Sequence, residues 1–110
     1  MKIKDFKEHY KDHLPVGEGW RPLLTKLAED ITKIDPNVEI SQIKEKFGTL
    51  RFYISYGSEE VFQLIEKAET ESGYICETCG TKEGVTTEGG WLLTLCVSCR
   101  DAYRKERGIK

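Results

Sequence analysis

The sequence predicts an α+β fold in which helices cover a β-hairpin and a zinc ribbon follows at the C-terminal end. Apolar residues recur at helical spacing in three segments, the period changes to two between Val38 and Tyr56, and four cysteines form two CxxC pairs. A chain of 110 residues can bury one modest core. We therefore expect one small domain over residues 1–110, with an α/β-hairpin part over residues 1–73 and a zinc ribbon with a basic C-terminal helix or tail over residues 74–110.

Three helices are expected before the cysteine-rich segment. The first covers residues 3–14, where apolar side chains recur at helical spacing before a proline. The second covers residues 20–34 and has a proline in its first turn. The third covers residues 59–72, with Ser58 as its N-cap and Gly73 as its C-terminal stop.

Residues 38–56 are expected to form a hairpin that turns at Gly48. The register about this turn pairs residues across the two strands as follows: Lys46 with Thr49, Lys44 with Arg51, Ile43 with Phe52, and Ser41 with Ile54. Because side chains alternate along a strand, one face then collects the apolar residues and enters the core. The residues expected on this core face are Ile43, Leu50, Phe52 and Ile54.

The opposite face of the hairpin carries Lys44, Lys46, Arg51 and Tyr53. Two cations directly opposite one another cost stability unless an anion or a nearby carboxylate compensates. We therefore interpret this face as a candidate binding site for an anionic group. The alternative is a solvated face whose charges splay apart or pair with glutamates of a neighbouring helix.

The four cysteines, Cys76, Cys79, Cys96 and Cys99, form the most specific pattern in the chain. Two CxxC turns can place four thiolates at the corners of a tetrahedron, which is typical of structural zinc. Gly80, just after the first pair, can adopt the positive φ that points N–H groups at the sulfurs, and the second pair has no such glycine. Four protein ligands leave no open position for water, so we expect zinc to stabilise this segment rather than to catalyse.

Residues 85–95, between the two pairs, predict a second hairpin that completes the zinc ribbon. Three other interpretations of the cysteines exist: a disulfide framework, a thioredoxin-like redox pair, and a zinc-linked switch in which oxidation ejects the metal. We expect no secretory signal, which argues against disulfides. Cys76 does not open a helix after a parallel strand, which argues against the redox pair.

The formal net charge is −2, so the chain as a whole is not the basic protein expected of a general nucleic-acid binder. Basic residues nevertheless gather at the C-terminal end: Arg100, Arg104, Lys105, Arg107 and Lys110. No apolar run is long enough to cross a membrane, and we expect a cytoplasmic protein without a membrane partner.

A string match adds to this interpretation. The run KEKFGTLRFY over residues 44–53, together with Gly19-Trp20, Cys79-Gly80 and the run GWLLTLC over residues 90–96, resembles small zinc-ribbon proteins of tailed phages and prophages. The resemblance covers roughly residues 17–99. Many members of that group finish the metal unit with a cysteine followed by a histidine, where this chain has a second CxxC pair. The resemblance implies a phage or prophage accessory protein that acts in the bacterial cytoplasm.

Together these features predict a non-enzymatic zinc-binding module. No nucleophile, base and orienting group can be assembled from the motifs, so we expect no enzyme. Because the net charge is negative and phage accessory proteins of this size often occupy a host factor, a bacterial host protein is the expected partner. Nucleic-acid or nucleotide binding through the basic hairpin face and the C-terminal tail is the alternative.

Overall fold

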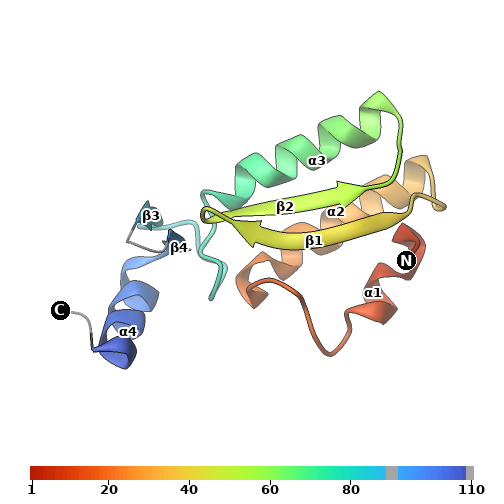
Figure 1. Cartoon of the computed structure of the whole chain (residues 1–110). Helices are drawn as coiled ribbons and strands as arrows, with labels where there is room; N and C mark the ends of the chain where they lie inside the picture. Colours follow the sequence, from red (N-terminus) through yellow and green to blue (C-terminus); the bar gives the residue numbers. More distant parts are fainter. Residues whose placement is uncertain (89–91, 109–110) are drawn as a thin grey trace.

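The computed structural model describes residues 1–88 and 92–108 and shows a mixed fold of helices and two small antiparallel sheets (Figure 1). In chain order, with η for 3-10 helices, the elements are η1 Ile3–Asp5, α1 Phe6–His9, η2 Glu18–Trp20, α2 Arg21–Ile34, β1 Ile40–Lys46, β2 Thr49–Ile54, α3 Glu59–Ser72, β3 Thr86–Glu88, β4 Leu93–Leu95 and α4 Val97–Arg107. The predicted combination of helices, a hairpin and a C-terminal cysteine cluster is confirmed.

Helices α2 and α3 begin and end close to where the sequence predicts. Pro22 lies in the first turn of α2, where its missing N–H removes no helical hydrogen bond. Ser58 caps α3, because its Oγ accepts a hydrogen bond from the backbone N–H of Val61 at 3.3 Å. The apolar stripes of the two helices bury the following side chains in the core: Leu24, Leu27, Ala28, Ile31, Val61, Ile65 and Ala68.

The helix expected over residues 3–14 is wrong in its extent. Only the short η1 and α1 form, and α1 ends at His9. The backbone carbonyl of Tyr10 accepts a hydrogen bond from Nη1 of Arg21 at 2.8 Å, which ties this point of the chain to the start of α2. Leu14 is still buried, but it reaches the core from an irregular segment.

Strands β1 and β2 form the predicted antiparallel hairpin, with Lys44 opposite Arg51 and Ile43 opposite Phe52. The turn residues Phe47 and Gly48 both have positive φ, 55° and 80°. Positive φ at both central residues is the pattern of a tight turn whose twist matches the flanking strands.

The register departs from the prediction at the start of β1. Ile40, and not Ser41, is the partner of Ile54, because the pairing is irregular between Ile40 and Gln42. Such a bulge sets two residues of one strand against one residue of the other. It turns Ile40 into the core, where only 6% of the residue is exposed.

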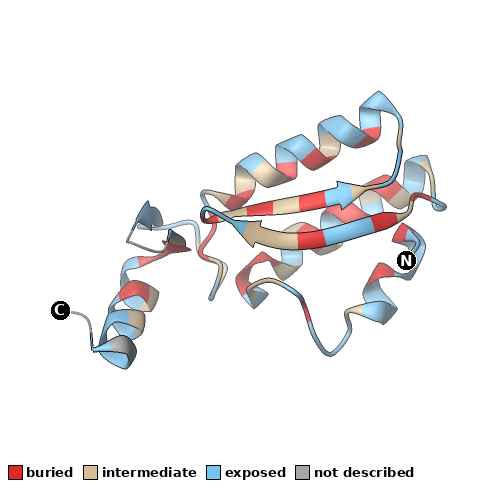
Figure 2. Ribbon diagram, viewed as in Figure 1, coloured by how far each residue is buried: buried red, intermediate tan, exposed pale blue. Residues whose placement is uncertain are grey.

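The two faces of the hairpin differ as predicted: burial alternates along β2, whereas β1 buries Ile40 and Ile43 with two exposed residues between them (Figure 2). Ile43, Leu50 and Phe52 are buried, and Ile54 is half-buried. Tyr53, on the other face, is 42% exposed. Helices α2 and α3 therefore cover one face of the hairpin and leave the cationic face in solvent.

The tip of this hairpin packs against the second, smaller hairpin of β3 and β4. The buried hydroxyl of Thr94 donates a hydrogen bond to the backbone carbonyl of Gly48 and lies 2.6 Å from the hydroxyl of Thr87. A Cβ at Gly48 would lie 2.5 Å from Cγ2 of Thr87. Glycine at this turn thus allows both the backbone conformation and the close approach of the second hairpin.

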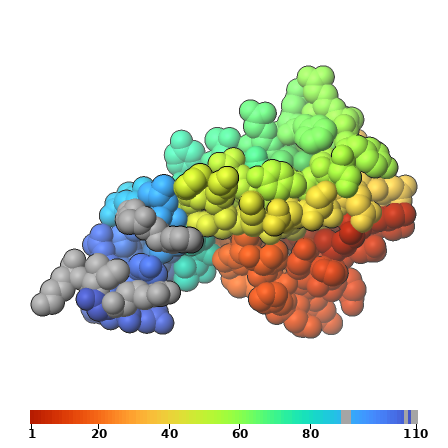
Figure 3. All heavy atoms as spheres, viewed as in Figure 1, coloured from red at the N-terminus to blue at the C-terminus, as the bar shows by residue number. Residues whose placement is uncertain are grey.

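The molecule is elongated, with extents of 47 × 27 × 21 Å, and α4 forms one end of it (Figure 3). Among the described helices, no segment combines the length and apolar character needed to cross a membrane. Residues 89–91, which the sequence places at the turn of the second hairpin, lie outside the described residues.

Candidate metal centre and adjoining cationic surface

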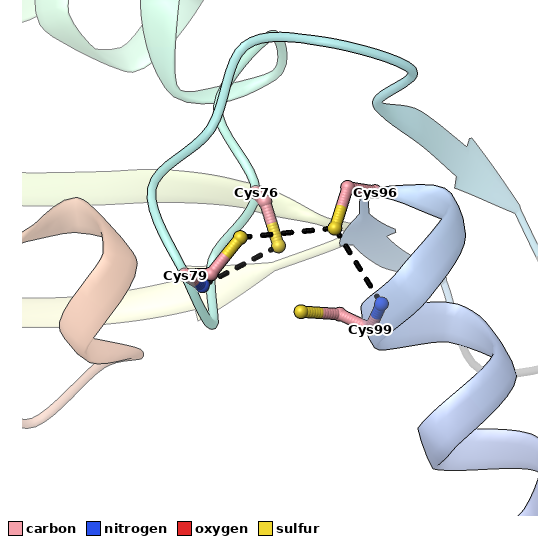
Figure 4. Close-up of side chains that lie close together, drawn as sticks. All are labelled: Cys76, Cys79, Cys96 and Cys99. Carbon is pink, nitrogen blue, oxygen red and sulfur yellow. Dashed lines mark hydrogen bonds between the residues drawn. The ribbon is translucent and has the colours of Figure 1, made fainter.

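The four cysteines predicted as metal ligands come together in space. Their sulfur atoms all lie within 4.8 Å of one another, and Sγ of Cys79 lies 3.7 Å from Sγ of Cys96 (Figure 4). Cys76 and Cys79 come from the turn after α3, whereas Cys96 and Cys99 come from the start of α4. All four thiols are free of disulfide bonds. The cluster could therefore hold one metal ion with four sulfur ligands.

Backbone N–H groups point at the sulfurs from both CxxC turns. The N–H of Cys79 donates to Sγ of Cys76, and the N–H of Cys99 donates to Sγ of Cys96, each at 3.5 Å. Gly80 has the expected positive φ of 84°, and its N–H donates to the carbonyl of Cys76 at 2.9 Å. The second turn needs no glycine, because Cys96 is the N-cap of α4 and the helix itself supplies the N–H donor.

The thiols differ in their ease of ionisation. Burial raises the pKa of Cys76, but backbone N–H donors from Cys79, Cys96 and Thr78 outweigh it and lower the pKa to about 6. Burial, followed by contact with the neighbouring thiols, raises the pKa of Cys99 above its ordinary value. The thiol of Cys76, with its lowered pKa, therefore loses its proton more readily than that of Cys99, and a bound cation would favour the thiolate form of both.

The first cysteine turn is fixed to the start of α2 by direct backbone contact. The N–H of Gly19 donates to the carbonyl of Glu77 at 2.9 Å, and Nε1 of the fully buried Trp20 donates to the carbonyl of Ile75 at 2.9 Å. A Cβ at Gly17 would lie 2.0 Å from the carbonyl oxygen of Glu77, and one at Gly19 would lie 2.1 Å from that of Cys76. These glycines are required because the two backbones touch.

Glu77 links the same turn to the second hairpin. Its N–H donates to the carbonyl of Thr94 at 2.9 Å, and the N–H of Thr94 donates to its carboxylate at 3.4 Å. Burial raises the pKa of the Glu77 carboxyl to about 7. The cysteine turn thus contacts both η2, just before α2, and the β3–β4 hairpin through main-chain hydrogen bonds.

Arg100 has a structural position that the sequence analysis missed. It is 8% exposed, and its guanidinium donates to the backbone carbonyls of Thr86, Glu88 and Leu93 at 2.7–3.3 Å. Arg100 therefore joins α4 to the second hairpin and is not available to bind phosphate. The sequence signal for this role was the position of Arg100 directly after Cys99. A helix that begins at the second cysteine pair must pack on the hairpin between the pairs, so a residue in its first turn can reach the hairpin carbonyls.

The remaining basic residues at the C-terminal end form a smaller free cationic cluster than the sequence suggests. Arg104 pairs with Glu88, with Nη2 3.2 Å from Oε1. Lys105 is exposed on α4. Lys110 and the side chain of Arg107 lie outside the described part of the structure.

The cationic face, defined as Lys44, Lys46, Arg51 and Tyr53, lies together on the outer side of the hairpin as the register requires. Nζ of Lys44 lies 5.8 Å from the centroid of the Tyr53 ring. Within the described ranges, none of its three cations forms a salt bridge, and the buried Nε of Arg51 has no hydrogen-bond partner. No glutamate of a described helix forms an ion pair with the face.

Phe47 extends this face at the tip of the hairpin. Its ring is 64% exposed, and Nζ of Lys46 lies 5.4 Å from the ring centroid. A bulky side chain at positive φ is unusual, because Asn, Asp or Gly adopts this conformation at lower cost. Core packing does not account for an exposed aromatic ring here, and backbone strain of this kind gathers at functional sites.

No protein-family model, curated protein or solved structure matches this chain. The function must therefore be argued from the site itself.

Replacing Gly19 by Ala tests the contact between η2 and the cysteine turn. The added Cβ collides with the main-chain carbonyl of Cys76, which cannot move without displacing that residue, so we expect a loss of about 3 kcal/mol in the free energy of unfolding. Gly73→Ala is the matched control, because Gly73 has φ −67° and its Cβ would meet no atom closer than 3.5 Å. Urea unfolding of the two variants should separate them, and equal stabilities would contradict the contact.

Proposed function

We propose that the protein is a zinc-binding, non-enzymatic module in which the metal completes a zinc ribbon. Zn–S bonds of about 2.3 Å place the sulfurs of a tetrahedral site about 3.8 Å apart. The separation of 3.7 Å between Cys79 and Cys96 matches this value, and the other pairs need only a small contraction from at most 4.8 Å. This geometry is the observation that supports the zinc site.

The metal would act as a structural cross-link. A cation held by Cys76, Cys79, Cys96 and Cys99 would join the turn after α3 to the start of α4. The apolar cluster in this part of the chain is small, with Cys76, Leu95 and Cys96 as its buried members. Metal binding therefore supplies folding free energy that apolar packing does not.

The binding role is supported by the unneutralised cationic face. Lys44 lies directly opposite Arg51, yet no carboxylate among the described residues pairs with either of them. An acidic partner would relieve the repulsion between the two cations. We propose that this partner is an acidic protein of the bacterial host and that the protein is a phage or prophage accessory protein acting in the host cytoplasm, as its resemblance implies.

Single-stranded nucleic acid is a second candidate partner. Proteins that bind it combine basic side chains with exposed aromatic rings on which bases stack. Phe47 and Tyr53 are exposed and lie beside Lys46 and Lys44, which is the observation that favours this candidate. The negative net charge of the chain favours the protein partner.

The purified protein should contain about one zinc ion per chain, and Cys76→Ser or Cys96→Ser should abolish tight zinc binding and unfold the segment from Gly73 onward. Ser98→Ala, which changes a residue between two ligands without removing a thiol, should keep the metal. Elemental analysis and amide exchange measure both effects. Iron in place of zinc, or a folded metal-free protein under reducing conditions, would contradict the zinc assignment.

Charge reversal at Lys44 and Arg51 should separate binding from stability. The double variant Lys44→Glu with Arg51→Glu should keep a melting temperature close to that of the wild type, because it exchanges one pair of opposed like charges for another, while the immobilised protein loses its specific partners from bacterial lysate. Lys4→Glu with Lys33→Glu is the matched control, because both lysines are exposed and lie away from the hairpin face.

Salt dependence distinguishes the two partner classes. Binding to nucleic acid should weaken with a log–log slope of roughly −0.7 to −0.9 for each phosphate contacted, whereas a protein partner should give a shallower slope. Capture by the double variant that equals that of the control would show that the cationic face is only a solvated surface.

A further inference from the structure

The two outer edges of the β1–β2 hairpin are treated differently by the fold. On the β2 edge, the N–H of Leu50 donates to Oγ of Ser72 at 2.8 Å, and the N–H of Phe52 donates to Oε2 of Glu69 at 2.8 Å. Both acceptors belong to α3, which runs alongside β2 in Figure 1. Side chains of α3 therefore occupy the positions that another strand would need on this edge.

Among the described residues, none hydrogen-bonds to the outer edge of β1 over residues 41–46 in this way. In an antiparallel pair, two residues that lie opposite one another either both direct their N–H and C=O groups at the other strand or both direct them away from it. Since Leu50 and Phe52 point outward, their partners Glu45 and Ile43 point outward on the other side. In the portion of the chain that the structure describes, the backbone N–H and C=O groups of Ile43 and Glu45 have no hydrogen-bond partner.

The same edge already accepts an extended segment immediately before this stretch. The N–H of Ile3 donates to the carbonyl of Val38, and the N–H of Ile40 donates to the carbonyl of Met1, both at 2.8 Å. Lys2 and Glu39 form an isolated antiparallel bridge between these bonds. The strand-like pairing stops at Ile40, and beyond it the outward groups of Ile43 and Glu45 have no partner within residues 1–88 and 92–108.

We propose that the β1 edge over residues 41–46 binds an extended acidic segment of the partner protein by strand addition. This inference rests on the proposed binding role and specifies its geometry: main-chain bonds to Ile43 and Glu45 would supply affinity, and Lys44 and Lys46 would select acidic side chains on the outer face. A second copy of this chain is a poor occupant, because pairing two β1 edges would bring lysines of the same face together.

Amide exchange of the zinc-loaded protein tests the edge directly. In the free protein, the amides of Ile43 and Glu45 should exchange rapidly, whereas those of Leu50 and Phe52 should be protected by their bonds to α3. Addition of a short peptide that alternates glutamate and valine should protect Ile43 and Glu45 at least tenfold. The same peptide with lysine in place of glutamate should not.

Glu45→Pro removes one outward N–H while keeping the strand at an edge position where proline is tolerated. Glu45→Thr is the matched control, because it loses the same carboxylate, and with it the 3.1 Å bond from the N–H of Gly48, but keeps the backbone N–H. The proline variant should bind the acidic peptide about tenfold more weakly than the threonine variant.

The outcomes separate this inference from the proposed binding role. Protection of Ile43 and Glu45 in the free monomer, a dimer that protects them, or peptide binding that leaves both amides exposed would each overturn strand addition. Failure of the acidic peptide to bind would overturn it as well. The charge-reversal capture experiment tests the cationic face and not the backbone groups of β1, so the proposed binding role can hold where strand addition fails.

Discussion

The close packing of four sulfur atoms is the interaction on which the C-terminal third of the structure depends. Cys76 and Cys79 lie in a turn whose backbone contacts η2, and Cys96 and Cys99 lie where α4 begins. The strands of the second hairpin have only three residues each, so they offer little packing of their own. A metal ion at the sulfurs, combined with Arg100 on the carbonyls, would hold turn, hairpin and helix in one arrangement.

This arrangement also places the candidate binding surface. The hydroxyl of Thr94 holds the Gly48 turn against the second hairpin, so the tip that presents Phe47 is supported from the metal side. On the other side of the hairpin, Ser72 and Glu69 of α3 occupy the β2 edge. The cationic face lies on the outer side of this hairpin, and the outward backbone groups of Ile43 and Glu45 have no partner among the described residues, so both proposals use surfaces of a well-supported hairpin.

The sequence predicted the elements whose signals are local. The caps of α3, the hairpin register near Gly48 and the four clustered cysteines follow from spacing and turn chemistry, and the structure confirms them. Long-range contacts were not predictable in the same way. The ladder slips at Ser41, the first helix stops at His9, and Arg100 bonds to hairpin carbonyls because of neighbours that are distant in sequence. The identity of the metal and the partner stay predictions.

X-ray absorption at the metal edge of the purified protein is the most direct measurement of the central claim. We expect a zinc edge with a first shell of four sulfur atoms at about 2.3 Å and no lighter scatterer. A first shell containing nitrogen or oxygen would mean that at least one of the four cysteines is not a ligand. A protein that contains no bound metal and still keeps the β3–β4 hairpin in place would contradict the claim that a metal ion holds the C-terminal third together.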